Sequence, residues 1–141
     1  MINYQQQAPT VAEYNHLRDH VGWGAYADAG AVVHGFKHSL FHVTVRDGDE
    51  LIGMGRVIGD GAITFYIQDV IVREDYRGQG IGKSIMERLM DYIARTATEN
   101  AVVGLFAAKG KEPFYERFGF IGRPNETLGK GMIHFWPGKS S

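Results

Sequence analysis

A glycine-rich octapeptide at Arg77–Ser84 constrains the fold of this chain more than any other stretch. Its sequence, Arg-Gly-Gln-Gly-Ile-Gly-Lys-Ser, places three glycines at alternate positions between an apolar run and a long amphipathic segment. Glycine lets the backbone adopt positive φ and approach a ligand closely, and the start of the following helix offers unpaired N–H groups and a partial positive charge. The loop is therefore predicted to join a strand to a helix and to bind an anion such as phosphate.

The spacing of these glycines excludes two common phosphate-binding loops. A Walker A loop requires a glycine five residues before Gly82, where this chain has Arg77. A dinucleotide fingerprint requires Gly-x-Gly-x-x-Gly directly after a strand, whereas here the pattern is Gly-x-Gly-x-Gly and residues 73–76 intervene. The chain is predicted to be neither a nucleoside triphosphatase nor a dinucleotide-binding protein.

The loop instead fits the pattern Arg/Gln-x-x-Gly-x-Gly/Ala. In this it resembles the GNAT superfamily of N-acetyltransferases, in which such a loop binds the pyrophosphate of acetyl-coenzyme A. Two further stretches extend the resemblance from Phe65 to Phe120. The segment Phe65–Val72 is similar to the family's central fourth strand, and Pro113–Phe120 is similar to its late Phe-Tyr-x-x-x-Gly-Phe signature.

Length, charge and composition exclude several classes of protein. The 141 residues suit a single domain, residues 1–141, with one core. Fifteen basic and 16 acidic residues give a net charge of -1, so no overall field attracts nucleic acid or an anionic membrane. The absence of cysteine excludes a thiolate nucleophile and a cysteine-ligated metal. Residues 1–7 lack a basic and then apolar leader, and no apolar run approaches the ~20 residues that span a bilayer, so a cytoplasmic protein is predicted.

The residue patterns predict an α/β (α+β) fold with a mixed, mainly antiparallel sheet flanked by helices. The resemblance adds that this sheet is GNAT-like and splayed between its fourth and fifth strands. The tail, residues 138–141, is expected to be mobile. The predicted elements are an edge strand at 2–6, a helix from a capping box at Thr10 to about His20, a short helix at Ala27–Val33, strands at Leu40–Val45, Leu51–Ile58 and Ala62–Val72, a helix from Ile81 to near Asn100, a buried parallel strand at Val102–Ala107, a helix at Glu112–Phe118, and closing strands at Phe120–Gly122 and Met132–Trp136.

The strand before the loop changes its pattern in the middle. Apolar and polar residues alternate from Phe65 to Gln68, but Val70–Val72 is continuously apolar. The break near Asp69 indicates either a β-bulge or a strand buried on both faces. A bulge would leave backbone groups free for a ligand, and the resemblance implies that pantetheine pairs with the backbone here.

Acetyl transfer to an amine requires a polarised carbonyl, a base and an acid. A backbone N–H near Val70 or Ile71 is expected to polarise the carbonyl. By its place in the family signature, Tyr115 resembles the general acid that protonates the sulfur, the alternative being a half-buried aromatic that only packs. Asp69, beside the break, is the candidate base, while Asp60 and Glu50 remain alternatives that are more often turn or solvated carboxylates.

The resemblance also assigns the residues that bind acetyl-coenzyme A. In family members that carry one, an asparagine before the Phe-Tyr pair holds the pantetheine, but here Ala108–Lys111 has none, and Lys109 is instead expected to reach a phosphate. The expected cofactor-binding residues are Val70, Ile71, Val72, Arg77, Gly78, Gln79, Gly80, Ile81, Gly82, Lys83, Ser84 and Lys109.

The acceptor is expected to be a primary amine, on a small molecule rather than on a protein or peptide. Trp23 and Tyr26 lie in the segment that covers the acceptor site in the resembled family, although a core role for both is an equal alternative. His34, His38 and His42 recur every four residues, but a strand pattern at His42 would scatter them, so no metal is expected. Many proteins of the resembled family pair, so a homodimer is one expected assembly. A non-catalytic coenzyme-A-binding module is the rival from another class.

Overall fold

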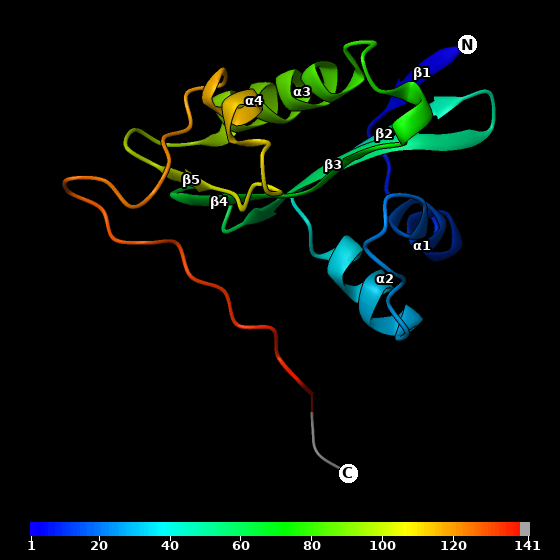
Figure 1. Ribbon diagram of the computed structural model, residues 1–141, viewed down its shortest axis with the longest axis horizontal. Helices are drawn as coiled ribbons and strands as arrows, with labels where there is room; N and C mark the ends of the chain where they lie inside the picture. Colours follow the sequence, from blue (N-terminus) through cyan, green and yellow to red (C-terminus); the bar gives the residue numbers. More distant parts are fainter. Residues whose placement is uncertain (139–141) are drawn as a thin grey trace. The chain divides into compact units, whose positions relative to one another are not determined.

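The computed structural model describes residues 1–138, and the chain divides into two compact units. The first, Met1–Leu105, holds a sheet with three helices, and the second begins at Phe106 and holds one short helix, α4 (Glu112–Glu116) (Figure 1). The prediction of one domain over residues 1–141 stays a prediction. The tail predicted to be mobile lies, apart from Gly138, outside the described residues.

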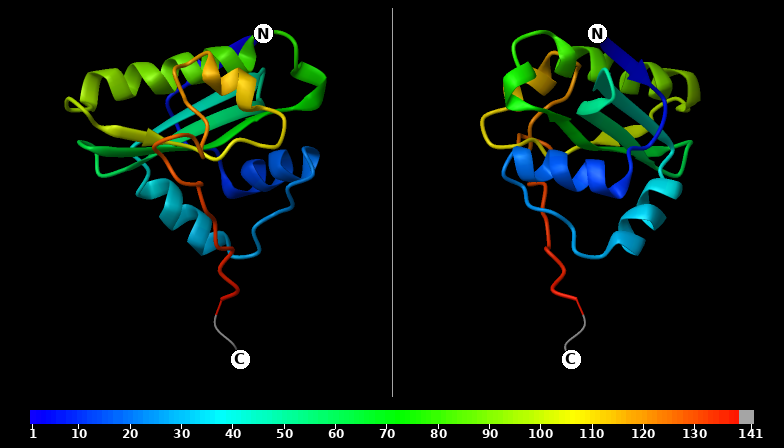
Figure 2. Two further views of the ribbon diagram at one scale, coloured as in Figure 1. Left: turned by 60° about the vertical axis from the view of Figure 1, so that its left-hand side comes forward. Right: turned by 90° about the vertical axis from the view of Figure 1, so that its right-hand side faces the viewer.

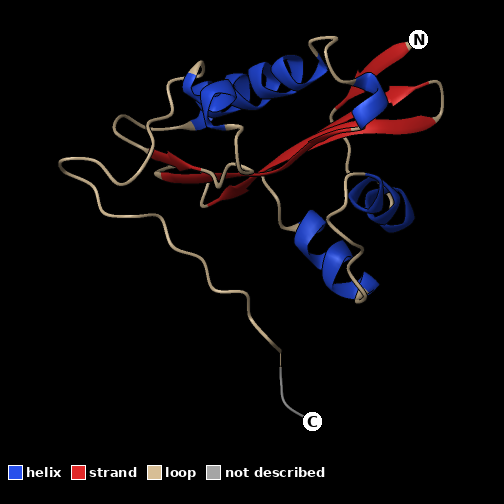
Figure 3. Ribbon diagram, viewed as in Figure 1, coloured by secondary structure: helices blue, strands red, loops and turns tan. Residues whose placement is uncertain are grey.

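A five-stranded sheet forms the centre of the first unit (Figure 3). Its strands lie in chain order, with antiparallel pairing throughout except for a parallel pair between the last two. This confirms the predicted fold class. The strands are β1 (Ile2–Gln5), β2 (Phe41–Asp47), β3 (Glu50–Gly59), β4 (Thr64–Val72) and β5 (Val102–Gly104).

The first two helices begin where side chains cap them. α1 (Val11–His20) has the predicted capping box, in which the Glu13 backbone N–H donates to Thr10 Oγ1 (3.1 Å) and the Thr10 N–H donates to Glu13 Oε1 (3.0 Å). α2 runs from Ala29 to Lys37 instead of Ala27–Val33, because Asp28 Oδ1 accepts from the Ala31 N–H (3.0 Å) and fixes a later start.

Helices cover both faces of the sheet. α3 (Ile81–Thr96) packs on one face, and α1 and α2 lie on the other (Figures 1 and 2). This helix is the predicted amphipathic segment, and its buried residues are Ile81, Ile85, Met86, Leu89 and Ile93. On the other face, the core consists of Tyr14, Leu17, Val32 and Phe36 against Leu51, Met54 and Ile71.

Two glycines of β3 allow α3 to pack closely. A Cβ at Gly55 would stand 2.8 Å from Ile85 Cγ2 and 3.0 Å from Leu89 Cδ1, and one at Gly53 would stand 3.4 Å from Ile85 Cδ1. The missing side chains therefore set the distance between the sheet and the helix that follows the glycine-rich loop.

The elements after Thr96 differ from the predicted ones. α3 ends at Thr96 rather than near Asn100, because Ala97 is extended and the Thr98 N–H donates to the Ala62 carbonyl (2.9 Å). β5 pairs in parallel as predicted, but only over Val102–Gly104, and Val102 is 65% exposed rather than buried. β5 is an edge strand, which is hydrogen-bonded to a neighbouring strand on one side only. The apolar run at Val102–Ala107 was therefore not sufficient to predict that its side chains are buried.

The closing strands predicted at Phe120–Gly122 and Met132–Trp136 are wrong. Neither range is in a strand in the described part of the second unit, and the apolar side chains of the latter range are exposed, Trp136 at 79%. An apolar pattern specifies a strand only where a partner strand completes the ladder. The short helix α4 ends at Glu116, two residues before the predicted end.

Candidate active site

β4 contains a β-bulge at the predicted break. Met54 pairs with Ile71 and Arg56 pairs with Gln68, so Gly55 alone stands opposite Asp69 and Val70. Asp69 has φ +57°, a conformation that few residues other than glycine adopt. Of the two alternatives at this break, the bulge is therefore correct.

The bulge changes which face of the sheet each following side chain meets. Val70 lies on the α3 side, since its Cγ2 is 3.6 Å from where a Cβ of Gly55 would stand. Ile71 belongs to the core under α1 and α2. Asp69, which simple alternation would place on the α3 side, instead points toward α1.

Asp69 is held in a buried polar cluster. The Tyr14 hydroxyl donates to Asp69 Oδ2 (2.9 Å), and Arg56 Nε donates to the same oxygen (2.8 Å). Asp69 Oδ1 is buried, has no hydrogen-bond partner in the part of the chain that the structure describes, and lies 3.8 Å from Arg18 Nη1. Burial, and then the charge of Asp69, raise the pKa of Tyr14, so its hydroxyl stays protonated and acts as a donor.

Arg18 organises the loop between α1 and α2. Its guanidinium carbon lies 4.6 Å from the ring centroid of Tyr26 and 5.6 Å from that of Trp23. Its Nε donates to the Gly24 carbonyl (2.7 Å) and its Nη2 to the Trp23 carbonyl (3.3 Å). Trp23 and Tyr26 are 45% and 52% exposed, so the alternative that they are core aromatics is wrong.

A pocket of about 210 Å³ lies beside this cluster. Its walls are mainly aromatic and aliphatic. Among the described residues that line it, Arg56 is the one with a charged side chain. Tyr26, predicted to meet the acceptor, is in the wall, whereas Trp23 is not. The lining residues are Tyr14, Tyr26, Ala31, Val32, Gly35, Phe36 and Arg56.

The glycine-rich loop presents open backbone at the start of α3. Gly78 and Gly80 have φ of +82° and +80°, and Gly80 caps the helix without a side-chain hydrogen bond. A Cβ at either glycine would meet no atom within 4 Å among residues 1–138, apart from those of its two chain neighbours. The exposed Lys83 and the half-exposed Arg77 add positive charge beside these N–H groups. The loop thus has the shape and charge that a pyrophosphate requires.

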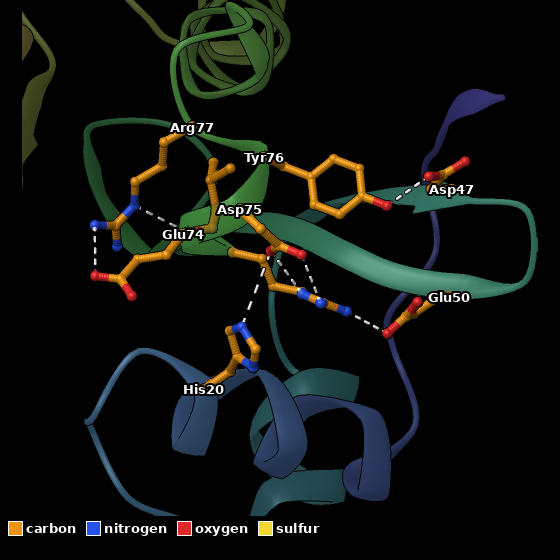
Figure 4. A network of polar contacts seen from close by, with 9 residues as sticks. His20, Asp47, Glu50, Glu74, Asp75, Tyr76 and Arg77 are labelled. Atoms are coloured by element: carbon orange, nitrogen blue, oxygen red, sulfur yellow. Dashed lines mark hydrogen bonds and ion pairs between the residues drawn. The ribbon is translucent and has the colours of Figure 1, made fainter.

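A network of polar contacts holds the segment just before the loop (Figure 4). This segment is the single-turn 3₁₀ helix η1 (Glu74–Tyr76), whose Tyr76 hydroxyl donates to Asp47 Oδ2. Arg73 pairs with Glu50 and with Asp75 (Nη2 to Oδ2, 2.8 Å), and His20 lies 3.9 Å from Asp75. The β2–β3 hairpin therefore fixes the end of β4 from which the loop departs.

The two other candidate bases have structural partners. Glu50 is the ion-pair partner of Arg73. Asp60 Oδ1 accepts from the backbone N–H groups of Ala62, Ile63 and Thr64 (2.9, 2.9 and 3.1 Å) and so builds the β3–β4 turn. Asp69 is the candidate that lies at the bulge.

Tyr115 and Lys109 belong to the second unit, whereas every other predicted site residue belongs to the first. Tyr115 is half-buried on α4, and its ring lies at 5.0 Å from Phe114 and 6.5 Å from Phe120 between centroids. Burial raises the pKa of Tyr115, so the hydroxyl carries its proton at neutral pH. Lys109 is exposed before α4.

The three histidines do not converge. His34 and His38 stack on α2 (4.2 Å between centroids), while His42 Nε2 on β2 hydrogen-bonds the Phe36 carbonyl (2.9 Å). Burial lowers the pKa of His42, which favours the neutral ring. Among residues 1–138, no group of three or more histidine, aspartate or glutamate side chains is placed to hold a metal ion.

Sequence reasoning missed Tyr14, Arg18 and Arg56 as site residues. A signal existed for Arg18, because a charged residue on the apolar face of a predicted helix needs a partner. The sequence contained no such signal for Arg56. Its partner on the neighbouring strand is Gln68, and an arginine opposite a polar residue does not indicate a functional site.

A bulged strand that leads into a glycine-rich loop and a helix, within a mixed sheet, is the arrangement that the resemblance to coenzyme-A-dependent acetyltransferases implied. A sequence model of the acetyltransferase (GNAT) domain matches residues 22–136. The chain belongs to the GNAT acetyltransferase family, whose acetyl donor is acetyl-coenzyme A, as the resemblance implied. No helix in residues 1–138 is both long enough and apolar enough to cross a membrane.

Three relatives show how far the similarity extends. An uncharacterised N-acetyltransferase, ycf52, from Porphyra purpurea is 30% identical over 128 residues, which are 88% of this chain and 70% of that protein. Histone acetyltransferase TAP1 from Glycine max is 34% identical over 130 residues, 85% of this chain but 54% of that protein. The crystal structure of a probable acetyltransferase from Staphylococcus aureus, SA2161, has a TM-score of 0.86 and 38% identity, covering 96% of this chain and 100% of that one.

Proposed function

We propose that this protein transfers the acetyl group of acetyl-coenzyme A to a primary amine on a small molecule, by direct attack within a ternary complex. One observation carries this proposal: the β4–β5 ladder ends at Tyr66, and the rest of β4 leads past the bulge into the glycine-rich loop, where Gly80 caps α3 without a side-chain hydrogen bond in the described chain. A thioester and its pyrophosphate can lie along such a continuous track.

The residues of β4 and of the glycine-rich loop fit successive parts of acetyl-coenzyme A. The N–H groups at the start of α3 and the cations Arg77 and Lys83 suit the pyrophosphate. The stretch Val70–Val72, which lies beyond the end of the β4–β5 ladder, suits the amide groups of pantetheine, which would add to the sheet as a further strand. Lys109 remains a proposed phosphate contact.

The proposed chemistry needs two proton transfers. The amine nitrogen attacks the thioester carbonyl carbon, so a C–N bond forms, the C–S bond breaks, and the sulfur leaves with the bond's electron pair. Tyr115 would donate a proton to this sulfur. Asp69 would accept the amine proton through Oδ1, the oxygen that has no hydrogen-bond partner, with water as the relay. The backbone N–H of Val70 or Ile71 would stabilise the carbonyl oxygen.

The pocket beside Tyr14 and Tyr26 is the proposed acceptor site. Its volume of about 210 Å³ is below the roughly 300–1,000 Å³ typical for drug-sized ligands, which favours a small amine. A protein acceptor is the second candidate, because the Glycine max relative is named as a histone acetyltransferase. Cytoplasmic location and pairing as a homodimer stay predictions.

Thiol release from acetyl-coenzyme A, measured over a panel of small amines and lysine peptides, tests the proposal. Turnover with small amines supports it, and turnover with peptides alone favours the second candidate. Tight binding of acetyl-coenzyme A in calorimetry without turnover on any acceptor would identify a non-catalytic binding module.

A further inference from the structure

We propose that the acceptor carries a carboxylate group, and that Arg56 binds this carboxylate in the pocket beside α1 and α2. The acceptor would then be a small aminocarboxylate, such as an amino acid. This inference rests on the proposed function, and it names the substrate class.

Arg56 has unused hydrogen-bond donors at the pocket. A guanidinium has five N–H groups. In this structure Nε donates to Asp69 Oδ2 and Nη1 donates to Ser39 Oγ (2.9 Å), which leaves three N–H groups without a partner in the described chain. They lie on the Nη1 and Nη2 end of the group, where two parallel bonds to a carboxylate can form.

The orientation of Arg56 is fixed before any ligand arrives. Asp69 and Ser39 hold it from two sides, and Ser39 Oγ in turn donates to the Gly35 carbonyl (2.8 Å). The guanidinium carbon also lies 5.4 Å from the Phe36 ring centroid, and only 16% of the side chain is exposed. A fixed and partly dehydrated guanidinium binds an anion with little loss of side-chain entropy.

The charges of the cluster favour an anion. Arg18 and Arg56 contribute two positive charges and Asp69 contributes one negative charge, so the cluster carries a net charge of +1. The Arg18 guanidinium already lies against the Tyr14, Trp23 and Tyr26 rings, within 5.6 Å of each centroid. The faces of these rings are therefore already occupied by the Arg18 cation. The positive charge of the cluster would repel an acceptor that carries only an ammonium group, and a carboxylate on the same acceptor offsets that repulsion.

Arg18 does not share the proposed role of Arg56. Three of its N–H groups already donate, to the Gly24 and Trp23 carbonyls and, at 3.4 Å, to the Tyr14 hydroxyl. It shapes the loop over the pocket, whereas Arg56 is part of the pocket wall.

Matched acceptors test the inference on the unmodified protein. Each of several amino acids, including glycine, β-alanine and phenylalanine, is compared with its carboxamide, which keeps the size but removes the charge. We expect kcat/KM to be about ten- to a hundredfold higher for the carboxylates, as expected for hydrogen bonds to a charged group. Equal values for both series would overturn the inference while leaving acetyl transfer established.

Two arginine variants assign the preference to a residue. Arg56→Lys keeps the charge but loses the two-pronged contact, so it should abolish most of the preference and leave acetyl-coenzyme A affinity unchanged. Arg46→Lys is the matched control, because Arg46 is also a half-buried strand arginine paired with one carboxylate, Glu13, but is not part of the pocket wall. If both variants keep the preference, Arg56 is not the carboxylate site.

A binding measurement separates this inference from the proposed function. The aminocarboxylate, without acetyl-coenzyme A, should raise the melting temperature of the wild type and of Arg46→Lys but not of Arg56→Lys. This result would stand even if no amine were acetylated, in which case the proposed function alone would fail. No shift with any aminocarboxylate, together with no preference in turnover, would reject the carboxylate site.

Discussion

Asp69 on β4 and Arg56 on β3 form an ion pair, with 2.8 Å between Asp69 Oδ2 and Arg56 Nε, at the point where a bulge shifts the register of the two strands. The bulge makes this contact, because simple alternation would point Asp69 at the opposite face of the sheet. The same irregularity therefore builds the wall of the proposed acceptor pocket and interrupts the strand that leads to the glycine-rich loop.

Asp69→Asn should destabilise the fold by about 3 kcal/mol, because it leaves Arg56 without its buried counter-charge. Denaturant unfolding monitored by circular dichroism would measure the change. Asp91→Asn is the control, since Asp91 pairs with Arg95 (3.4 Å) on the exposed face of α3 and should cost under about 0.5 kcal/mol. If folded Asp69→Asn keeps full turnover, Asp69 is not the base.

The Glu13–Arg46 pair should make stability depend on pH in the acid range. The hydrogen bond from Arg46 lowers the pKa of Glu13 from 4.5 to about 2. Because the folded pKa is the lower one, the contribution of the pair is complete above pH 4.5 and is lost as the pH falls from 4.5 toward 2. Melting temperatures between pH 2 and 6 should fall less steeply for Glu13→Gln than for the wild type, while Glu87→Gln, on the exposed side of α3, should follow the wild type. Parallel curves for all three proteins would contradict this.

Gly80→Ala should weaken acetyl-coenzyme A binding by about tenfold in calorimetry. Gly80 adopts the left-handed conformation, which costs a residue with a Cβ roughly 1–2 kcal/mol. The loop of the alanine variant would therefore change to another backbone conformation. Apart from its two chain neighbours, nothing in the described residues lies within 4 Å of the added carbon, so the core should be undisturbed. Gly30→Ala in α2, where φ is ordinary, should bind the cofactor like the wild type. Unchanged affinity in Gly80→Ala would remove the loop from the cofactor site.

Tyr115→Phe keeps the ring and removes the proton that the sulfur is proposed to receive. Turnover should fall by roughly ten- to a thousandfold with little change in cofactor affinity. Tyr92→Phe, at a half-buried tyrosine that stacks on Phe41 (4.5 Å between centroids), is the control and should keep its rate. An unchanged rate in Tyr115→Phe would assign this residue to packing.

Replacing Tyr26 by alanine should raise the KM for the amine and leave the KM for acetyl-coenzyme A nearly unchanged, because Tyr26 lines the proposed acceptor pocket. Trp23→Ala should have a smaller effect, since Trp23 acts through Arg18 rather than from the wall. Tyr4→Ala removes another ring that stacks on an arginine, Arg88 (4.2 Å), away from the pocket, and should change neither constant. A rise confined to the KM for acetyl-coenzyme A would refute the assignment.

The sequence was informative where the determinants of structure are local. The capping box at Thr10 and the amphipathic pattern of α3 depend on residues within a few positions, and both were predicted. The contact between Tyr14 and Asp69 joins residues 55 positions apart, and the direction of Asp69 depends on the bulge conformation rather than on residue type. The closing strands failed for a related reason, because a strand depends on a partner that its own residues do not specify.

The glycines at positions 53 and 55 limit how this enzyme can be engineered. Exchanging glycine for alanine is a common route to thermostability, because it reduces the disorder of the unfolded chain. At Gly55 the new methyl group would push against Ile85 and Leu89 on the helix whose first turn is proposed to face the donor phosphates. An alanine at that position would therefore displace α3 and with it the proposed coenzyme site, so heat resistance is better sought on the exposed side of α3.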